Sequence, residues 1–419
     1  MVRMAEASAA RDITIIGAGI VGICIAARLA EAGVRVTVID RTGICAETSS
    51  GNAAALAFSE VLPLAHKGMI AKVPRWLLDP LGPLAIPPTY LPSLAGWLYR
   101  FWRAGSAAEF NQAVSAQTAM MNLARAEWMD LMHASGTRHM LREDGCLELY
   151  ESAAEHEASR SGWQERERAG IEIHHLAGEE IAQYQPGLSS RFVRAVFVPG
   201  WNNVADPAEL GRAIWRHAES QGAQWMQDRV VAVAHENGQQ RLRLESGAEH
   251  IASGLVIAAG AWSHRLAAML GDQIPLEAER GYNTTLPPDA FDLRRQISFP
   301  AHGFVVSPLA TGIRVGGAVE FGGLERPPNF ARSKAMLRKA ADFLPGLKTD
   351  GGREWMGHRP SLPDSLPVID ASSKPGIWYA FGHGHLGLTQ AAATGRLICD
   401  LVLGQKPPVP LAPFSASRF

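Results

Sequence analysis

The spacing of apolar and polar residues near the start of the chain changes period twice. A short apolar run, Ile13–Ile16, precedes the glycine-rich turn 17–22, and a helical pattern follows over Ile23–Ala32. A second β-branched run, Val34–Ile39, ends in Asp40. The pattern predicts a strand, a tight turn, a helix and a second strand within about 30 residues.

Each glycine of this turn has its own expected role. Gly17 allows the tight turn, Gly19 lets the backbone approach a pyrophosphate, and Gly22 lets helix and strand pack closely. The unpaired N–H groups at the start of the helix attract phosphate oxygens. Asp40 stands where a carboxylate accepts hydrogen bonds from ribose hydroxyls and repels a 2′-phosphate. The motif therefore predicts NAD or FAD rather than an NADP-type ligand; the alternative is an ordinary structural turn.

The rest of the chain separates NAD from FAD. After Asp40 the chain enters a polar loop, 47–55, and then proline-broken helical segments over 56–135. An NAD enzyme usually continues there with further strand–helix units. Patterns typical of a nucleotide-binding domain return later, at 208–221, 230–233, 241–244, 254–263 and 378–404. A domain assembled from separated pieces favours FAD.

Composition narrows the class of protein. At 419 residues the chain suits two domains, and 47% hydrophobic with 19% charged residues is typical of a globular enzyme. With a net charge of −1, the protein as a whole is not attracted electrostatically to nucleic acid or to an anionic membrane. No nucleic-acid-binding motif occurs, so we expect no nucleic-acid partner. The sequence does not indicate an oligomeric state.

Cysteine usage and the apolar runs indicate a compartment. Cys24, Cys45, Cys146 and Cys399 are scattered without CxxC spacing, which argues against a disulfide scaffold, a zinc site or an iron–sulfur cluster. Residues 1–12 contain no apolar signal-peptide core, and no run of eighteen apolar residues occurs. We therefore expect a cytoplasmic protein.

Several motifs in order resemble the D-amino-acid oxidase/glycine oxidase family of FAD enzymes, and within it the D-amino-acid dehydrogenases, including D-hydroxyproline dehydrogenase-like members. The resemblance covers essentially the whole chain. It rests on GAGIVG with Asp40, TSSGNA, GLVIAAGAWS, ERGYN, WMGHRPSLPDSLPVI and FGHGHLGLT. It implies noncovalent FAD, because Cys399 lies well after the last glycine turn, away from the expected position of the flavin ring.

The resemblance and the strand pattern imply an α/β fold of two discontinuous domains. A Rossmann-like FAD-binding domain is expected over 11–55, 205–272 and 350–408. A substrate domain with a mixed, largely antiparallel sheet is expected over 56–204 and 273–349, where 297–323 has the pattern of successive strands.

The family places the loop 47–55 beneath the isoalloxazine ring and the helix after 381–387 against the flavin N1/C2=O edge, where it stabilises negative charge. A solvated serine-rich loop and, for Val230, a plain core strand are the alternatives. The family often has glycine at the position of Ala54. The residues expected to bind FAD are Gly17, Ala18, Gly19, Ile20, Val21, Gly22, Asp40, Arg41, Thr48, Ser49, Ser50, Gly51, Asn52, Val230, Ala259, Gly260, Trp262, Gly384, His385, Leu386, Gly387, Leu388 and Thr389.

Arg359 is the main candidate for binding substrate. Arginine is the natural bidentate partner of a carboxylate, and in the family the arginine of the matching RP segment clamps the substrate α-carboxylate. Tyr282 is expected to donate its hydroxyl to the same carboxylate, and the backbone carbonyl of His385 to orient the amine. The alternatives are a structural ion pair for Arg359 and a buried aromatic role for Tyr282.

Two further features have competing interpretations. His383 and His385 alternate on a glycine turn but lack further ligands, so we expect no metal site. The segment 74–105 is rich in Trp, Tyr and Phe interleaved with Arg, including Arg75 and Trp76. It predicts a helix packed over the side of the flavin domain, a cover to the active site or, as in membrane-associated relatives, a peripheral patch at the inner face of the cell membrane.

The implied reaction is oxidation of a D-α-amino acid by hydride transfer from Cα to flavin N5. The imino acid then hydrolyses to a 2-oxo acid and ammonium, and electrons pass to a non-oxygen acceptor such as a quinone or another redox carrier. The enzyme acts mainly by orientation, so no protein base is required once the amine is neutral. Open alternatives are a cyclic imino acid (D-proline or 4-hydroxy-D-proline), a glycine or sarcosine oxidase using oxygen, an NADPH-dependent hydroxylase, and a flavin-binding partner subunit.

Overall fold

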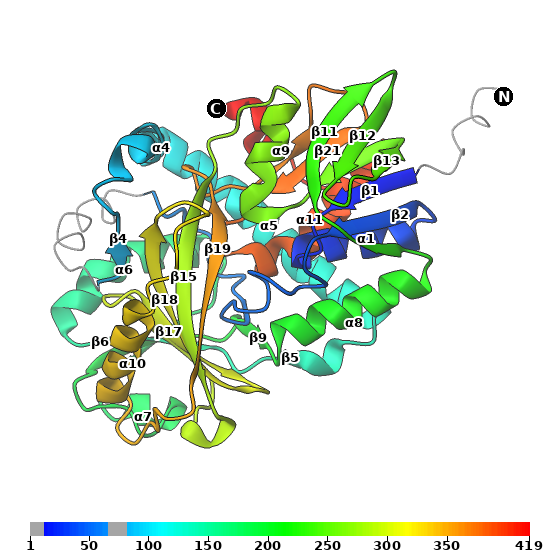
Figure 1. Ribbon diagram of the computed structural model, residues 1–419. Helices are drawn as coiled ribbons and strands as arrows, with labels where there is room; N and C mark the ends of the chain where they lie inside the picture. Colours follow the sequence, from blue (N-terminus) through cyan, green and yellow to red (C-terminus); the bar gives the residue numbers. More distant parts are fainter. Residues whose placement is uncertain (1–11, 66–81) are drawn as a thin grey trace.

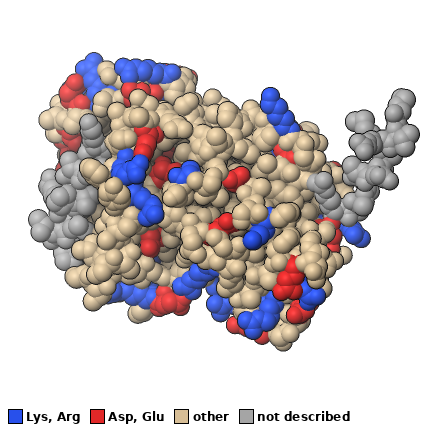
Figure 2. All heavy atoms as spheres, turned by 90° about the horizontal axis from the view of Figure 1, so that it is seen from above, with Lys and Arg blue, Asp and Glu red and all other residues tan. Residues whose placement is uncertain are grey.

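Two large sheets stand side by side, each with its own set of helices (Figure 1). The computed structural model describes residues 12–65 and 82–419, so Arg75 and Trp76 lie outside the described residues. Seen from above, basic and acidic side chains are interspersed, and no field of a single sign covers this face (Figure 2). This distribution agrees with the net charge of −1.

The first sheet has six strands drawn from three distant stretches of the chain. In spatial order they are β10 (Gln224–Gln227), β2 (Arg35–Asp40), β1 (Asp12–Ile16), β14 (Gly254–Ile257), β21 (Ile377–Phe381) and β20 (Val368–Ala371). All neighbours are parallel except β20 and β21. Because β2 and β14 lie on opposite sides of β1, the topology switches there. Open α/β sheets bind ligands at such a switch point, outside the carboxyl ends of the strands.

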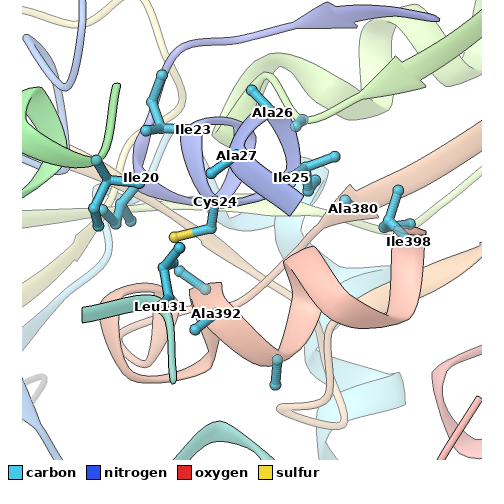
Figure 3. Packing of buried hydrophobic residues seen from close by; sticks show 14 of the residues in the cluster. Ile20, Ile23, Cys24, Ile25, Ala26, Ala27, Leu131, Ala380, Ala392 and Ile398 are labelled. Atoms are coloured by element: carbon cyan, nitrogen blue, oxygen red, sulfur yellow. The ribbon is translucent and has the colours of Figure 1, made fainter. Parts of the chain in front are cut away.

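Helices pack tightly on this sheet. The group comprises α1 (Ile20–Glu31), α11 (Gly387–Leu403), α8 (Pro207–Ser220) and α5 (Ala107–Ala134). Helix α1 packs against α8 and α11, and α11 packs against α5. A Cβ on Gly395 of α11 would stand 2.8 Å from the carbonyl oxygen of Cys24, so the close approach requires glycine. Figure 3 shows Cys24 pointing toward Leu131 of α5 and Ala392 of α11.

A separate apolar core lies on the other face of the six-stranded sheet. It is closed by a small antiparallel sheet and a short helix: β11 (Val230–Glu236), β12 (Gln239–Leu244), β13 (Glu249–Ala252) and α9 (Ser263–Met269).

The second large sheet has nine strands. They are β19 (Arg353–Ser361), β15 (Glu277–Leu286), β18 (Gly312–Phe321), β17 (Phe304–Leu309), β16 (Gln296–Phe299), β6 (Cys146–Tyr150), β8 (Arg194–Val198) and β7 (His174–Ala177), with β4 (Leu84–Ala85) beside β18. The pairs β16–β6 and β18–β4 are parallel and the rest antiparallel. Helix α10 (Ala331–Phe343) packs on β15 and β18.

Shorter elements connect these layers. The helices are α4 (Leu91–Ala104), α6 (Ala153–Arg168) and α7 (Glu180–Tyr184). A third sheet joins β3 (Ala55–Leu56), β9 (Asn202–Val204) and β5 (Leu141–Arg142). Single 3-10 turns are η1 (Arg138–Met140), η2 (Gly260–Trp262), η3 (Pro288–Ala290), η4 (Ala412–Phe414) and η5 (Ala416–Arg418). None of the helices within 12–65 and 82–419 combines the length and apolar character that a membrane crossing needs.

The predicted strand–turn–helix–strand unit is confirmed by β1, α1 and β2. Helix α1 begins at Ile20 rather than Ile23, because the hydroxyl of Ser49 accepts the Ile20 N–H at 3.0 Å and caps the helix from a distant loop. One strand departs from the expected domain division: β19 lies within 350–408 but pairs along its length with β15 in the nine-stranded sheet. The other predicted boundaries stay a prediction.

Candidate active site

A cavity of about 1850 Å³ lies between the two large sheets. Its walls come from the carboxyl ends of β1, β2 and β14, the loop 47–55, the turn before α11, and parts of β6, β15, β16 and β19. Ligand pockets usually enclose about 300–1,000 Å³. This cavity therefore has room for a large cofactor together with a substrate.

Most residues expected to bind the cofactor line this cavity. They are Gly17, Gly19, Ile20, Val21, Asp40, Arg41, Thr48, Ser49, Gly51, Asn52, Val230, Ala259, Gly260, Trp262, Gly384, His385, Leu386, Gly387, Leu388 and Thr389. Ala18, Gly22 and Ser50 are not part of the lining. The N–H of Ala18 donates to Asp40, Gly22 packs against the turn, and the hydroxyl of Ser50 donates to the carbonyl of Glu47.

Two glycines of the first turn are required by their surroundings. Gly17 has a φ of 111°, and a Cβ there would stand 2.4 Å from the Ala258 carbonyl oxygen. A Cβ on Gly22 would stand 2.0 Å from the Gly17 carbonyl oxygen. The close packing of turn, helix and neighbouring strand therefore excludes any side chain at both positions.

The carboxylate of Asp40 organises the end of β2. It accepts the N–H of Ala18 at 2.9 Å, of Thr42 at 2.8 Å and of Gly43 at 3.2 Å. A carboxylate has about four acceptor positions, so one lone pair remains for a ligand. Asp40 lines the cavity, as a ribose-binding acid must.

Arg41 and Trp262 close the same end of the cavity. Nitrogens of Arg41 donate to both oxygens of Glu47, and the guanidinium carbon lies 4.0 Å from the centre of the Trp262 ring. The arginine is thus held in place from two sides before any ligand binds. Glu47 was not among the predicted residues, because its role depends on a contact with Arg41.

The polar side chains of the loop 47–55 mostly hold the loop itself. The hydroxyl of Thr48 donates to the carbonyl of His358 at 3.0 Å, and Asn52 donates to the carbonyl of Ser49 at 3.0 Å. Ala54 adopts a φ of 60°, the left-handed conformation that favours the glycine found in the family. The loop can therefore offer mainly backbone groups to a cofactor.

The nine-stranded sheet fixes this loop from the other side. Asn283 donates to the carbonyl of Gly51 at 2.8 Å, and Arg314 donates to the carbonyl of Ser50 at 3.0 Å. Burial lowers the pKa of Arg314 to about 10. These contacts tie the cofactor loop to the sheet that bears Arg359.

The glycine turn before α11 forms another wall. The N–H of Gly384 donates to the carbonyl of Pro360 at 2.7 Å, and the turn then feeds the first residues of α11 into the lining. The hydroxyl of Thr389 accepts the N–H of Ala57 and donates to the carbonyl of Ala55. Thr389 therefore joins α11 to β3, while the backbone at the start of α11 faces the cavity.

Both histidines of this turn line the cavity. His383 is buried, its Nε2 lies 3.0 Å from the hydroxyl of Thr394, and burial lowers its pKa to about 3. His385 faces the cavity, and burial lowers its pKa while Glu60 and Glu279 raise it. Within 12–65 and 82–419 no three His, Cys, Asp or Glu side chains are grouped as metal ligands would be.

Arg359 and Glu279 stand opposite each other on neighbouring strands, β19 and β15. The guanidinium of Arg359 leans across Gly281, where a Cβ would stand 2.6–2.7 Å from its atoms. Glu279 leans the other way, and its Oε1 accepts the hydroxyl of Ser361 at 2.7 Å. Both line the cavity, so a cation and an anion are displayed there side by side.

Arg359 has few protein partners. Among the described residues its hydrogen bond is from Nη1 to the carbonyl of Ala318 at 3.4 Å, and no carboxylate lies within ion-pairing distance. Burial lowers its pKa, whereas Glu279 raises it. A guanidinium stays charged in proteins. Most N–H groups of Arg359 therefore have no acceptor among the described residues and are available to a ligand.

Tyr282 lines the same cavity as Arg359, but its hydroxyl is held by other residues. Its hydroxyl donates to Glu320 and accepts the N–H of Asn329 at 3.1 Å, and its ring packs edge-on against Phe330 beside α10. Glu320 also pairs with the fully buried Arg280. The role expected for Tyr282 stays a prediction, and the structure gives its hydroxyl two other partners.

The residues around the β1–β2 end fit a flavin adenine dinucleotide. Asp40 has a lone pair for ribose, α1 starts at the cavity wall, and a Cβ on Gly260 or Gly384 would meet no protein atom within 4 Å. Cys399 is outside the lining, and its thiol lies 3.6 Å from the carbonyl of Arg28 in the helix core. Noncovalent attachment stays a prediction.

Sequence comparison extends over nearly the entire chain. The family model described as FAD dependent oxidoreductase (DAO) matches residues 12–401. A D-amino-acid oxidase of Bradyrhizobium diazoefficiens is 34% identical over 417 residues, covering 98% of this chain and 99% of that protein. A D-amino acid dehydrogenase of Rhizobium rhizogenes is 28% identical, covering 97% and 99%. These matches confirm the predicted family resemblance and FAD dependence.

Solved structures share the fold. Glycine oxidase from Geobacillus kaustophilus superposes with a TM-score of 0.75 at 21% identity, covering 98% of this chain and 99% of that one. L-proline dehydrogenase from P. horikoshii gives 0.74 at 20% identity, covering 98% and 97%. The predicted mixed α/β fold is confirmed.

Proposed function

Because the chain belongs to the DAO family of FAD-dependent oxidoreductases, we propose that it oxidises D-amino acids at the Cα–N bond. The observation that carries the proposal is the Arg359–Glu279 pair, a cation and an anion on one cavity wall without an ion pair between them. A zwitterionic α-amino acid has the complementary charges. The D configuration is supported by the names of the sequence relatives.

Binding of FAD would use the β1–β2 end of the cavity. Asp40 would accept from ribose, the backbone at Gly17–Gly19 and the start of α1 would hold the pyrophosphate, and the loop 47–55 with the start of α11 would hold the flavin. When bound, FAD supplies the acceptor for two electrons and the Cα hydrogen, at flavin N5.

Arg359 would bind the substrate carboxylate. Its fork matches two carboxylate oxygens, and the low-polarity surroundings strengthen such a charge-assisted pair. Gly281 leaves the room in which the guanidinium lies. Holding the carboxylate fixes the position of Cα, and orientation of this kind can contribute about 7–11 kcal/mol in favourable cases.

Glu279 would bind the substrate nitrogen. It is only 5% exposed, and its Oε2 has no hydrogen-bond partner among the described residues. This carboxylate would accept a proton from the ammonium, leaving a neutral amine whose lone pair forms the C=N bond as Cα loses its hydrogen with the bonding electrons. The resulting iminium ion then takes up water and releases ammonium and a 2-oxo acid. The expected backbone carbonyl of His385, on the turn before α11, would be a second acceptor.

The electron acceptor is proposed to be a carrier other than oxygen, such as a quinone. The dehydrogenase relatives support it, whereas the oxidase relative supports oxygen. Peroxide formation in air at the rate of dye reduction would favour the oxidase; slow peroxide formation with rapid dye reduction would favour the dehydrogenase. Glycine and sarcosine belong in the same assay, because glycine oxidase shares the fold.

We also propose that helix α4 places this cytoplasmic enzyme against the inner face of the membrane. Its outer side exposes Leu91 at 47%, Tyr99 at 58% and Trp102 at 61%, and Arg100 and Arg103 are exposed nearby. Aromatic residues with basic neighbours suit an anionic lipid interface. Sedimentation with phosphatidylglycerol vesicles should be lost in a Tyr99→Ser/Trp102→Ser variant; equal sedimentation of both proteins would contradict docking by α4.

The central experiment is anaerobic mixing with D- and L-amino acids, D-proline and 4-hydroxy-D-proline, followed by flavin absorbance. Rapid bleaching by D-amino acids supports the proposal. Bleaching only by the cyclic compounds would support the imino-acid alternative. Bleaching only by L-amino acids would overturn the proposed D configuration of the substrate.

A further inference from the structure

The cavity has a second polar wall, on strands β6 and β16. Glu148 and Tyr150 lie on the same face of β6, since they are two residues apart, and Ser298 of β16 stands beside Glu148 in the ladder. All three line the cavity that also holds Arg359. Four strands separate β19 from β6 in the sheet, so a substrate held at Arg359 reaches this wall only with a long side chain.

Hydrogen bonds and burial act in opposite directions on the charge state of Glu148. The Trp163 indole N–H donates to the Tyr150 hydroxyl at 2.7 Å, and that hydroxyl donates to Oε1 of Glu148 at 2.5 Å. An indole N–H can only donate, so the tyrosine proton is directed to the carboxylate. The Tyr150 hydroxyl favours the anionic form of Glu148 and leaves its other oxygen as an acceptor, whereas burial raises the pKa of this carboxyl.

The neighbouring cation is already neutralised. Arg166 donates from Nη2 to both oxygens of Glu60, at 3.1 and 3.2 Å, and its guanidinium lies 4.8 Å from the centre of the Trp163 ring. Glu148 has no ion-pair partner among the described residues. The charge of Arg166 thus lies near Glu148 but forms no ion pair with it, because Arg166 pairs with Glu60.

Gln296 adds an independent sign of a missing donor. It lines the cavity next to Ser298, is 1% exposed, and its Oε1 has no hydrogen-bond partner among the described residues. An unsatisfied buried amide oxygen is costly, and a ligand carrying N–H groups would satisfy it.

We propose that this wall, which we call the Glu148 wall (Glu148, Gln296 and Ser298), binds a cationic substrate side chain, so that D-lysine and D-arginine are the preferred substrate class. The inference rests on the proposed amino-acid oxidation. The side-chain ammonium or guanidinium donates to Glu148, and the amide and hydroxyl of the other two residues accept further N–H groups. Glu148 is half-buried, and a carboxylate withdrawn from water without an ion-pair partner is unfavourable, so a bound cation relieves that cost.

The test compares substrates that differ only in charge. Steady-state dye reduction is measured with D-lysine and with D-norleucine, which lacks the terminal amino group. We expect kcat/KM for D-lysine to exceed that for D-norleucine by about 10- to 100-fold, as for a charge-assisted hydrogen bond. Glu148→Gln should remove most of this difference by lowering kcat/KM for D-lysine and leaving that for D-norleucine within about twofold.

Glu157→Gln is the matched control, because Glu157 is an exposed residue of α6 that pairs with Arg160 and is outside the cavity lining. It should keep the wild-type preference for D-lysine. Equal kcat/KM for the two substrates in the wild type, or an equal loss for both in Glu148→Gln, would overturn the inference while leaving D-amino-acid oxidation intact. Failure of every D-amino acid to reduce the flavin would instead overturn the proposed function itself.

Discussion

The guanidinium of Arg359 lies across Gly281, in space that the β-carbon of any other residue at position 281 would enter. A Cβ there would stand 2.6–2.7 Å from Nη2, Cζ and Nε. The glycine therefore contributes to the proposed substrate site through the side chain that it lacks, and strands β15 and β19 hold the two residues in this relation.

Gly281→Ala tests this relation. The added methyl group should displace the Arg359 guanidinium, and a displacement of about 1 Å at a reacting centre can cost about 100-fold in rate. We expect KM for D-amino acids to rise about tenfold or more, with FAD affinity unchanged. Gly322→Ala is the control, since a Cβ there meets Arg326 and Arg280 at the ordinary distances of 3.4–3.5 Å. Equal kinetics for both variants would contradict the steric account.

Glu279→Gln tests proton acceptance. The amide keeps the hydrogen bond with Ser361 but cannot take a proton, so kcat/KM near neutral pH should fall about 100-fold, the lower range for general-base catalysis. The loss should shrink as pH rises, because more substrate then arrives with a neutral amine. Glu277→Gln, on the same strand but outside the cavity lining, should have the wild-type profile. A loss that is constant with pH would indicate a structural role.

The dinucleotide end of the site could be predicted from the sequence because its chemistry is local. Gly17, Gly22 and Asp40 act through backbone contacts within one βαβ unit, and their spacing reports those contacts directly. Even there, the start of α1 was misplaced by three residues, since the cap comes from Ser49, 29 residues further along the chain.

The substrate end depends on pairing between distant strands. Glu279 and Arg359 become neighbours only through the β15–β19 register, and ERGYN alone does not reveal which of its residues face the cavity. Strand alternation puts Gly281 beside Arg359 and Tyr282 toward α10, where its hydroxyl meets Glu320. If the β15–β19 register were known, the alternation of side chains along β15 would indicate which of its residues face the cavity.

Asp40→Asn tests the cofactor end. The amide has fewer acceptor positions than the carboxylate and no charge, while the backbone N–H groups of Ala18 and Thr42 still need an acceptor. Loss of a charge-assisted bond predicts an FAD dissociation constant raised about tenfold or more. Flavin fluorescence during titration measures it. Asp12→Asn, at the opposite end of β1, should bind FAD as the wild type does; the same weakening there would contradict a ribose role for Asp40.

His383 predicts a pH dependence of stability. Its pKa is about 3 in the fold and near 6.5 when unfolded, so between these values the unfolded chain binds one more proton. The contribution of the neutral His383 to the free energy of unfolding is fully present above pH 6.5 and is lost as pH falls toward 3. From pH 7 to pH 5 this amounts to about 2 kcal/mol. His383→Gln should lose correspondingly less stability than the wild type in urea unfolding of the FAD-bound protein. Parallel losses in the two proteins would contradict a neutral buried imidazole.

The most direct test of the central claim pairs a change in the enzyme with a change in the substrate. Anaerobic flavin reduction is measured with a D-amino acid and with its carboxamide, in the wild type and in Arg359→Ala; Arg353→Ala, on the exposed end of β19, is the control. If Arg359 binds the carboxylate, the wild type and the control will strongly prefer the acid, by about 100-fold in reduction rate at limiting substrate, and Arg359→Ala will lose that preference. An undiminished preference in Arg359→Ala would show that the carboxylate binds elsewhere and would contradict the proposed site.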